Sequence, residues 1–233
     1  MHRKQQGFTL IEIAIVLVII GLLLGGILKG QELITSARVR NLISQQDGIK
    51  AAFFGFQDRF RALPGDYALA STTINCTPAC TNGNGNGQIT ANGVAGATID
   101  EQIAAWEHLS KSGFINGSYT YAAAPETTTS APTNPYSRYI QIIYDAVYDG
   151  NPTARHNIKT GNQIPSDILA EVDRKIDDGS ATGGGFRFSV YAGQSSGGGV
   201  APVGSGTCYN AAAPNNWMTT GTISTNCGGA SLL

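Results

Sequence analysis

The chain has 233 residues, of which 13% are charged, with 30 glycines and a formal net charge of −1. This length is enough for a membrane segment and one sizeable domain, and the near-neutral charge excludes the basic footprint of a nucleic-acid-binding protein. Low charge with many glycines is typical of an extracytoplasmic, β-rich domain.

The N-terminal end combines a short basic leader with a long apolar run. Residues 1–7 hold two basic side chains and end at Gly7. Phe8–Leu28 follows, with Glu12 as its one charged residue in 21 positions. A helix of that length, rising about 1.5 Å per residue, is roughly 32 Å long and spans the hydrocarbon core of a bilayer. The preceding positive charges predict a cytoplasmic N-terminus and an extracytoplasmic remainder.

Glu12 is the anomaly in this apolar run. An ionised carboxyl at a membrane helix centre costs on the order of 2.5–3.5 kcal/mol, and less near the interface, so it indicates a functional contact. A carboxyl that reaches the interface or is protonated is the alternative interpretation. The run is longer than the apolar region of an ordinary secretory signal and lacks a small-residue cleavage site at its end. Cleavage is therefore expected before it, at Gly7-Phe8.

The segment Gly7-Phe8-Thr9-Leu10-Ile11-Glu12 after a short basic leader resembles the signature of type IV prepilins, which include type IV pilins and type II secretion pseudopilins. The resemblance implies that a prepilin peptidase cleaves between Gly7 and Phe8 and methylates the new amine of Phe8. It also implies that Glu12, the fifth residue of the mature chain, meets the Phe8 amine of a neighbouring subunit. Pairing these charges lowers the desolvation cost of both and favours polymerisation.

The same resemblance implies the partners and the location of the chain. The expected partners are prepilin peptidase, other pilin or pseudopilin subunits, an inner-membrane assembly platform and the membrane, with no nucleic acid. We expect a single pass through a bacterial inner membrane, with the bulk of the chain in the periplasm, followed by entry into a pilus or pseudopilus. The sequence does not distinguish a pilus subunit from a subunit of a secretion system. The size of the chain favours a minor subunit over a major one.

A helix is predicted to continue beyond the apolar run. No proline occurs between Phe8 and Leu63, and apolar residues recur at alternating spacings of three and four, which is one face of a helix. Pro64-Gly65 ends the pattern. The stripe is expected to pack on a domain rather than to bind a ligand. It comprises Val39, Leu42, Gln46, Ile49, Phe53, Phe56, Phe60 and Leu63.

Four cysteines follow, and an even number in an exported chain favours disulfides. Among three possible pairings, proximity in sequence favours Cys76–Cys80 and Cys208–Cys227. The longer of the two loops gains on the order of 3 kcal/mol in the chain-entropy model. The spacings do not fit a zinc site.

Asn82, Asn84 and Asn86 have the spacing that opens an EF-hand-like calcium loop. Asparagine stands where aspartate is usual, and the twelfth position is Gly93 rather than a bidentate glutamate. The sequence therefore favours a glycine-rich turn, braced by Cys76–Cys80, over a calcium site.

The rest of the chain predicts two short helices and two strands. The helices are expected over Ile99–Ser112 and Pro165–Ile176, and the strands over Tyr136–Tyr148 and Phe186–Ala192. His108, in the first helix, is expected to be a packed or capping residue rather than a ligand. Acids at the end of the second helix can contact a cation, but a solvated helix end is the favoured interpretation.

These elements predict an α+β fold in which a long N-terminal helix, transmembrane in its first half, packs on a C-terminal antiparallel sheet, as in pilins. The expected segments are a leader (1–7), a transmembrane or filament-core helix (8–28), its amphipathic continuation (29–63) and an extracytoplasmic globular domain (64–233). The strand order is not predicted.

Two function classes fit the sequence. The first is a structural subunit, a pilin or pseudopilin, that needs no cofactor and catalyses no reaction, consistent with the absence of hydrolase, metalloprotease and phosphate-binding motifs from the sequence. The second is a single-pass anchored extracytoplasmic binding or enzymatic domain. It predicts an uncut N-terminus and a pocket with converging polar groups.

Overall fold

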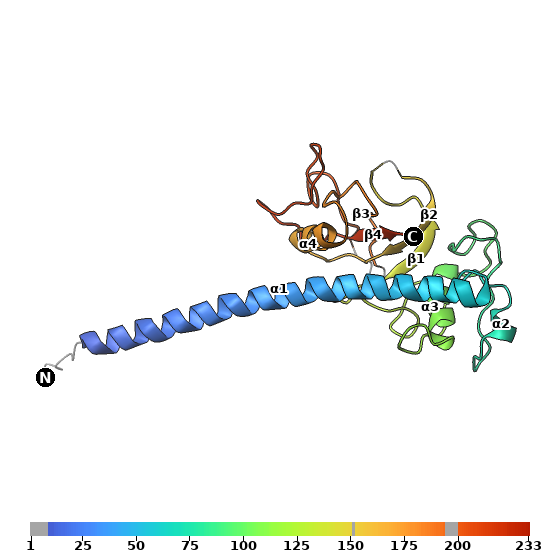
Figure 1. Ribbon diagram of the computed structural model, residues 1–233, viewed down its shortest axis with the longest axis horizontal. Helices are drawn as coiled ribbons and strands as arrows, with labels where there is room; N and C mark the ends of the chain where they lie inside the picture. The colour runs from blue at the N-terminus through green and yellow to red at the C-terminus, as the bar shows by residue number, and fades with distance from the viewer. Residues whose placement is uncertain (1–8, 151, 194–199) are drawn as a thin grey trace, which may run out of the picture. The chain divides into compact units, whose positions relative to one another are not determined.

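The computed structural model describes residues 9–150, 152–193 and 200–233 (Figure 1). The chain divides into two compact units, with the boundary between Arg38 and Val39. This boundary falls inside the first helix, α1, which spans Leu10–Phe60.

In the first unit, α1 exposes its apolar side chains. Every large apolar side chain from Leu10 to Leu28 is between 46% and 88% exposed. A Cβ added at Gly21, Gly25, Gly26 or Gly30, the described glycines of this unit, would meet no atom within 4 Å. In the described part of the chain, α1 is the helix long and apolar enough to span a membrane. A surface this apolar requires lipid or neighbouring helices around it.

The second unit holds a four-stranded antiparallel sheet in the order β1-β2-β4-β3. The strands are Gln141–Asp145 (β1), Arg155–Lys159 (β2), Phe186–Phe188 (β3) and Gly229–Leu232 (β4). The C-terminal strand lies inside the sheet, where Ser231 pairs with Ile158 on one side and Phe186 on the other. The predicted α+β class, a long N-terminal helix with a C-terminal antiparallel sheet, is confirmed.

Three shorter helices accompany the sheet, at Ala70–Thr73 (α2), Glu101–Lys111 (α3) and Ser166–Ile176 (α4). Helix α3 contacts β1, and Figure 1 shows α4 beside β3. Each of these two helices closes a separate part of the core.

The second part of α1 contributes to both parts of the core. Ile49, Phe53 and Phe56 pack with Trp106 of α3 and with apolar residues of β1 and β2. Val39 and Leu42 pack with α4, β3 and the disulfide-closed C-terminal loop. The predicted stripe is confirmed from its start through Phe56, and Phe60 and Leu63 are partly buried against the same core.

Some predicted boundaries were wrong. Helix α1 ends at Phe60 rather than Leu63, because Arg61 takes a left-handed conformation with φ of 53° that a helix cannot continue. The strand expected over Tyr136–Tyr148 is limited to β1, because Asn134 and Arg138 close a turn ahead of it. The strand expected over Phe186–Ala192 stops at Phe188, where pairing with β4 ends.

Strands β2 and β4 were not predicted. β2 carries charged and amide side chains, and its Lys159 is buried only because it forms an ion pair with Asp145 on β1. β4 begins at a glycine that the packing requires, since a Cβ at Gly229 would lie 2.3 Å from the ring of Phe186. Neither strand has the β-branched and aromatic composition that marks strands in a sequence.

Candidate functional site

Glu12 lies in the first turn of α1 and forms a reciprocal cap with Thr9. The backbone N and the hydroxyl of Thr9 donate to Glu12 Oε2 at 2.8 and 2.7 Å. The backbone N of Glu12 lies 3.3 Å from Thr9 Oγ1, to which it donates. This is a capping box, which satisfies backbone donors at a helix N-terminus that would otherwise lack partners. The Thr-x-x-Glu spacing is the sequence signal for this cap.

The cap directs the Glu12 carboxylate toward the N-terminal end of the helix. Within residues 9–150, 152–193 and 200–233, no lysine or arginine forms an ion pair with it. Apolar side chains surround it along α1. A carboxylate in this position can form an ion pair with a cationic group that does not belong to the described residues.

Gly7 and Phe8, the predicted cleavage position, lie outside the described residues. Cleavage and methylation there, and the intersubunit contact of Glu12, stay predictions. Of the predicted site, the structure therefore describes Glu12 and its partner Thr9, at the start of α1.

The four cysteines form two disulfides, Cys76–Cys80 and Cys208–Cys227. Both sulfurs of the second bond lie in residues with no exposed surface. Cys227 also forms an antiparallel bridge with Ile164, just before α4. This bond therefore ties the C-terminal loop to the part of the core that contains α4 and β3.

The loop with the three asparagines uses their side-chain oxygens within the protein. The amide oxygens of Asn82, Asn84 and Asn86 accept from the backbone N of Ser71, Asn86 and Gln88 respectively, at 2.8, 3.0 and 2.8 Å. These are hydrogen bonds of a folded loop, of the kind that asparagine makes in turns. They give the weak calcium candidates a structural role, and calcium binding by them stays an untested prediction.

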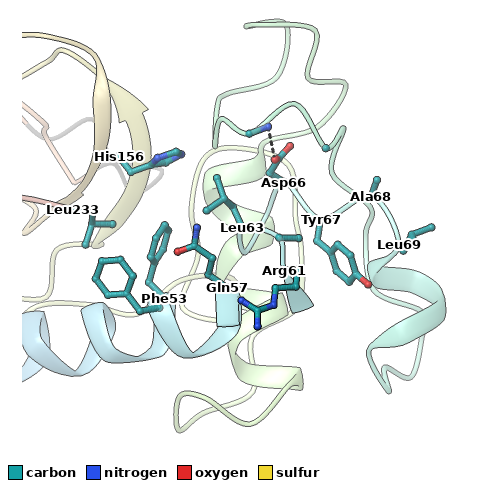
Figure 2. Close-up of a pocket in the computed structure, with 14 residues that line it drawn as sticks. Phe53, Gln57, Arg61, Leu63, Asp66, Tyr67, Ala68, Leu69, His156 and Leu233 are labelled. Atoms are coloured by element: carbon teal, nitrogen blue, oxygen red, sulfur yellow. Dashed lines mark hydrogen bonds between the residues drawn. The ribbon is translucent and has the colours of Figure 1, made fainter. Parts of the chain in front are cut away.

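Two carboxylates organise this loop from inside. Asp66 accepts from the backbone N of Asn86 at 3.0 Å and from that of Gly87 at 2.8 Å, the second of which Figure 2 draws. Glu101 accepts from the backbone N of Asn84 and Thr90. Burial raises the pKa of both carboxyl groups, against the lowering effect of these hydrogen bonds. Neither residue was predicted, because a buried acid that binds backbone N–H groups has no sequence motif.

A cavity of about 620 Å³ lies between the end of α1 and this loop (Figure 2). Its walls are mainly apolar and include Phe53, Phe54 and Leu69. Arg61 and His156 also line it. Asp66 reaches the cavity wall, but its carboxylate is bound by the loop backbone. The described residues do not place a nucleophile beside a base here, as catalysis by a Ser or Cys enzyme requires.

His108 is a structural residue, as predicted from the sequence. It is fully buried, Gly65 N donates to its Nδ1 at 2.8 Å, and its Nε2 lies 2.7 Å from Thr81 O. The ring is therefore neutral, with its proton on Nε2. Burial lowers the pKa of His108, while Thr81 and the charge of Glu107 oppose the shift.

This geometry predicts a pH-dependent stability. Because the pKa of His108 is lower in the folded chain, the unfolded chain takes up a proton first as pH falls below about 6.5. The stability is present above that pH and is lost toward pH 5, at a rate of up to about 1.4 kcal/mol per pH unit. Unfolding of the full chain in detergent from pH 7 to 5 should show this slope, and His108→Gln should reduce it.

The control for that measurement is His156→Gln. Burial also lowers the pKa of His156. This variant therefore loses the part of the slope that His156 contributes and keeps the part that His108 contributes. An unchanged slope in His108→Gln would show that the buried ring does not titrate with folding.

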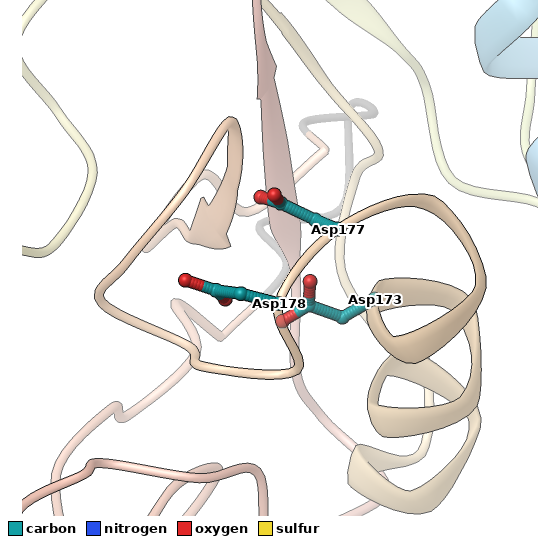
Figure 3. Close-up of side chains that lie close together, drawn as sticks. All are labelled: Asp173, Asp177 and Asp178. Carbon is teal, nitrogen blue, oxygen red and sulfur yellow. The ribbon is translucent and has the colours of Figure 1, made fainter.

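Three aspartates converge at the end of α4. One carboxylate oxygen from each of Asp173, Asp177 and Asp178 lies within 4.8 Å of the others (Figure 3). Asp173 is fully buried, and Asp178 is exposed. The sequence analysis favoured a solvated helix end here, which is wrong for Asp173.

Comparison with known proteins gives one match. Residues 2–28 match the model of the prokaryotic N-terminal methylation motif. Searches of curated proteins and of solved structures found no match. The matched segment contains Gly7, Phe8 and Glu12 and overlaps the exposed apolar part of α1. Residues 2–28 therefore carry the N-terminal methylation motif that is the hallmark of type IV prepilin-like proteins, and this motif supports a precursor of the pilin or pseudopilin type.

Proposed function

We propose that this chain is a minor structural subunit of a type IV pilus or of a type II secretion pseudopilus, assembled through α1. The observation that carries the proposal is the methylation motif over residues 2–28. Its position supports cleavage between Gly7 and Phe8 by a prepilin peptidase and methylation of Phe8. The chain would then act by polymerisation and catalyse no reaction.

The first unit of the structure supports this mechanism physically. Its apolar side chains from Leu10 to Leu28 are exposed, so they favour lipid before assembly and neighbouring helices after it. Transfer between two apolar environments costs little hydrophobic free energy, and packing and polar contacts then decide the balance. The polar contact is the Glu12 carboxylate with the methylated amine of Phe8 on another subunit.

The same proposal assigns the segments of the chain. Residues 1–7 are the leader, 8–28 the membrane and filament-core helix, 29–60 its amphipathic continuation and 61–233 the extracytoplasmic domain. Before assembly the chain spans the inner membrane once, with a cytoplasmic N-terminus and a periplasmic domain, and an inner-membrane platform extracts it. The length of the chain, 233 residues, supports a minor rather than a major role.

Substitution of Gly7 tests this proposal in the bacterium that makes the chain. A side chain at the cleavage position obstructs the peptidase, so Gly7→Val should leave the leader attached and remove the chain from the filament fraction. Gln6→Ala, one residue earlier, is the control and should be processed and assembled normally. Gel mobility and immunoblotting of membrane and filament fractions report both steps. Normal cleavage and assembly of Gly7→Val would refute the proposal.

A further inference from the structure

The three aspartates at the end of α4 lie close together. Asp173 belongs to the last turn of the helix, and Asp177 and Asp178 follow that turn (Figure 3). The C-terminal end of a helix carries a partial negative charge, which adds to the charge of the three acids and favours a cation. Among the described residues, none of the three forms an ion pair with a lysine or arginine.

The buried aspartate has an unused oxygen. Asp173 has no exposed surface, and its Oδ2 accepts from the indole N of Trp217 at 2.7 Å. Its Oδ1 is buried and has no hydrogen-bond partner in the described structure. A buried polar atom without a partner carries a desolvation cost that proteins rarely leave uncompensated. Asp173 is one of the three acids, so a cation bound to the group can supply the partner that this oxygen lacks.

The two other aspartates each commit one oxygen to the protein. Asp177 Oδ2 accepts from the backbone N of Gly185 and Phe186 at 2.5 and 2.7 Å. Asp178 Oδ1 accepts from Ser180 N at 2.8 Å. The second oxygen of each accepts no hydrogen bond from the described residues. The loop backbone therefore fixes both carboxylates and leaves an oxygen of each available.

The glycines before β3 bring the chain close over these acids. A Cβ at Gly184 would lie 2.0 Å from Asp177 Oδ2, and one at Gly183 would lie 2.6 Å from Asp178 Oδ2. Gly184 also has a φ of +57°, which side chains other than glycine rarely adopt. The loop can surround the acids only because these positions have no side chain.

We propose that Asp173, Asp177 and Asp178 bind a calcium ion. Calcium takes six to eight oxygen ligands at about 2.3–2.6 Å, so two of its ligands can be nearly 5 Å apart. Magnesium, at about 2.0–2.1 Å, requires a tighter group and retains its waters. Three carboxylates within 4.8 Å therefore suit calcium, with water and backbone carbonyls completing the shell. A site with this few protein ligands belongs to the weak class of extracellular modules, with Kd on the order of 0.1–1 mM.

The ion would hold together three segments of the second unit. Asp173 reaches Trp217 of the Cys208–Cys227 loop, and the Trp217 ring lies near Phe186 and Phe188 of β3, with centroids 6.2 and 6.3 Å away. Calcium bound to Asp173 would therefore stabilise α4, β3 and the disulfide loop as one group. This inference goes beyond filament assembly and does not depend on it.

Terbium luminescence tests the site directly, because Tb³⁺ replaces calcium and accepts energy from a nearby tryptophan. The full chain in detergent micelles contains two tryptophans, Trp106 and Trp217. The indole N of Trp217 donates to Asp173, one of the three acids. We expect saturable luminescence that CaCl2 displaces and that Trp106→Phe retains. CaCl2 at about ten times its Kd should also raise the unfolding midpoint by about 3–6 °C.

Asp178→Asn is the main test variant, because the residue is exposed and its loss should leave the fold intact. It should weaken calcium competition at least tenfold and abolish the calcium-dependent shift of the unfolding midpoint. Asp167→Asn, at the opposite end of α4, is the matched control and should behave as the unchanged chain. Absence of saturable binding, an equal response in Asp178→Asn, or an equal shift with MgCl2 would overturn the calcium site.

Discussion

Replacement of Glu12 with alanine should remove the chain from filaments without preventing removal of the leader. The reason is that the proposed assembly buries the amine of the processed N-terminus beside Glu12 of a neighbouring subunit. Removing one member of a buried ion pair costs about 3–5 kcal/mol, since the other charge is left without a partner. Incorporation should therefore fall by at least about a hundredfold. The amount of chain in the filament fraction, relative to the membrane fraction, measures this.

The matched control is Glu32→Ala on the same helix. Glu32 forms an ion pair with Lys29 in which both side chains are about two thirds exposed, at 68% and 67%. Exposed pairs of this kind contribute about 0–1 kcal/mol, so its loss should change incorporation little. If both variants assembled equally well, Glu12 would have only the local capping role that its contacts with Thr9 show.

The second large effect is expected for Phe56→Ala in the second unit. Phe56 is fully buried, and its ring contacts those of Phe60, Tyr67, His108 and Phe114. Removal of a buried aromatic ring costs about 3–5 kcal/mol because it leaves a cavity that the core only partly fills. Denaturant unfolding of the full chain in detergent, followed by fluorescence of the buried tryptophans, measures this loss.

Phe54→Ala makes the same change two residues away. Phe54 is 51% exposed, so its truncation should cost no more than about 1 kcal/mol. This pair of variants separates the buried face of α1 from the exposed one. Equal losses in both would show that the helix does not pack on the domain through the face that the structure describes.

The parts of the fold predictable from sequence were those with a long periodic pattern. The apolar stripe along α1 has a period that only a helix face satisfies. The residues of the stripe from Val39 to Phe56 are buried in the structure. The disulfide pairing was also expected from proximity, and the structure contains both bonds. Strands β2 and β4 were missed because their residues are buried through tertiary partners, such as Asp145 for Lys159, rather than through their own composition.

The candidate site was only partly predictable for a related reason. Glu12 is visible in the sequence because a charge in an apolar run is rare. The role of Thr9 follows from a four-residue pattern and was available but unused. Asp173, in contrast, is buried by Trp217, which lies 44 positions further along the chain. No local pattern predicts a contact of that kind, since it depends on how the disulfide loop folds over α4.

The intact mass of the chain, recovered from its own cell, shows whether the chain is a processed filament subunit. Tandem mass spectrometry of the N-terminal peptide identifies the first residue and any group on its amine. We expect a chain that begins at Phe8, carries one methyl group on that amine and contains two disulfides. A chain that begins at Met1 with an intact leader, in cells that process other prepilins, would contradict it.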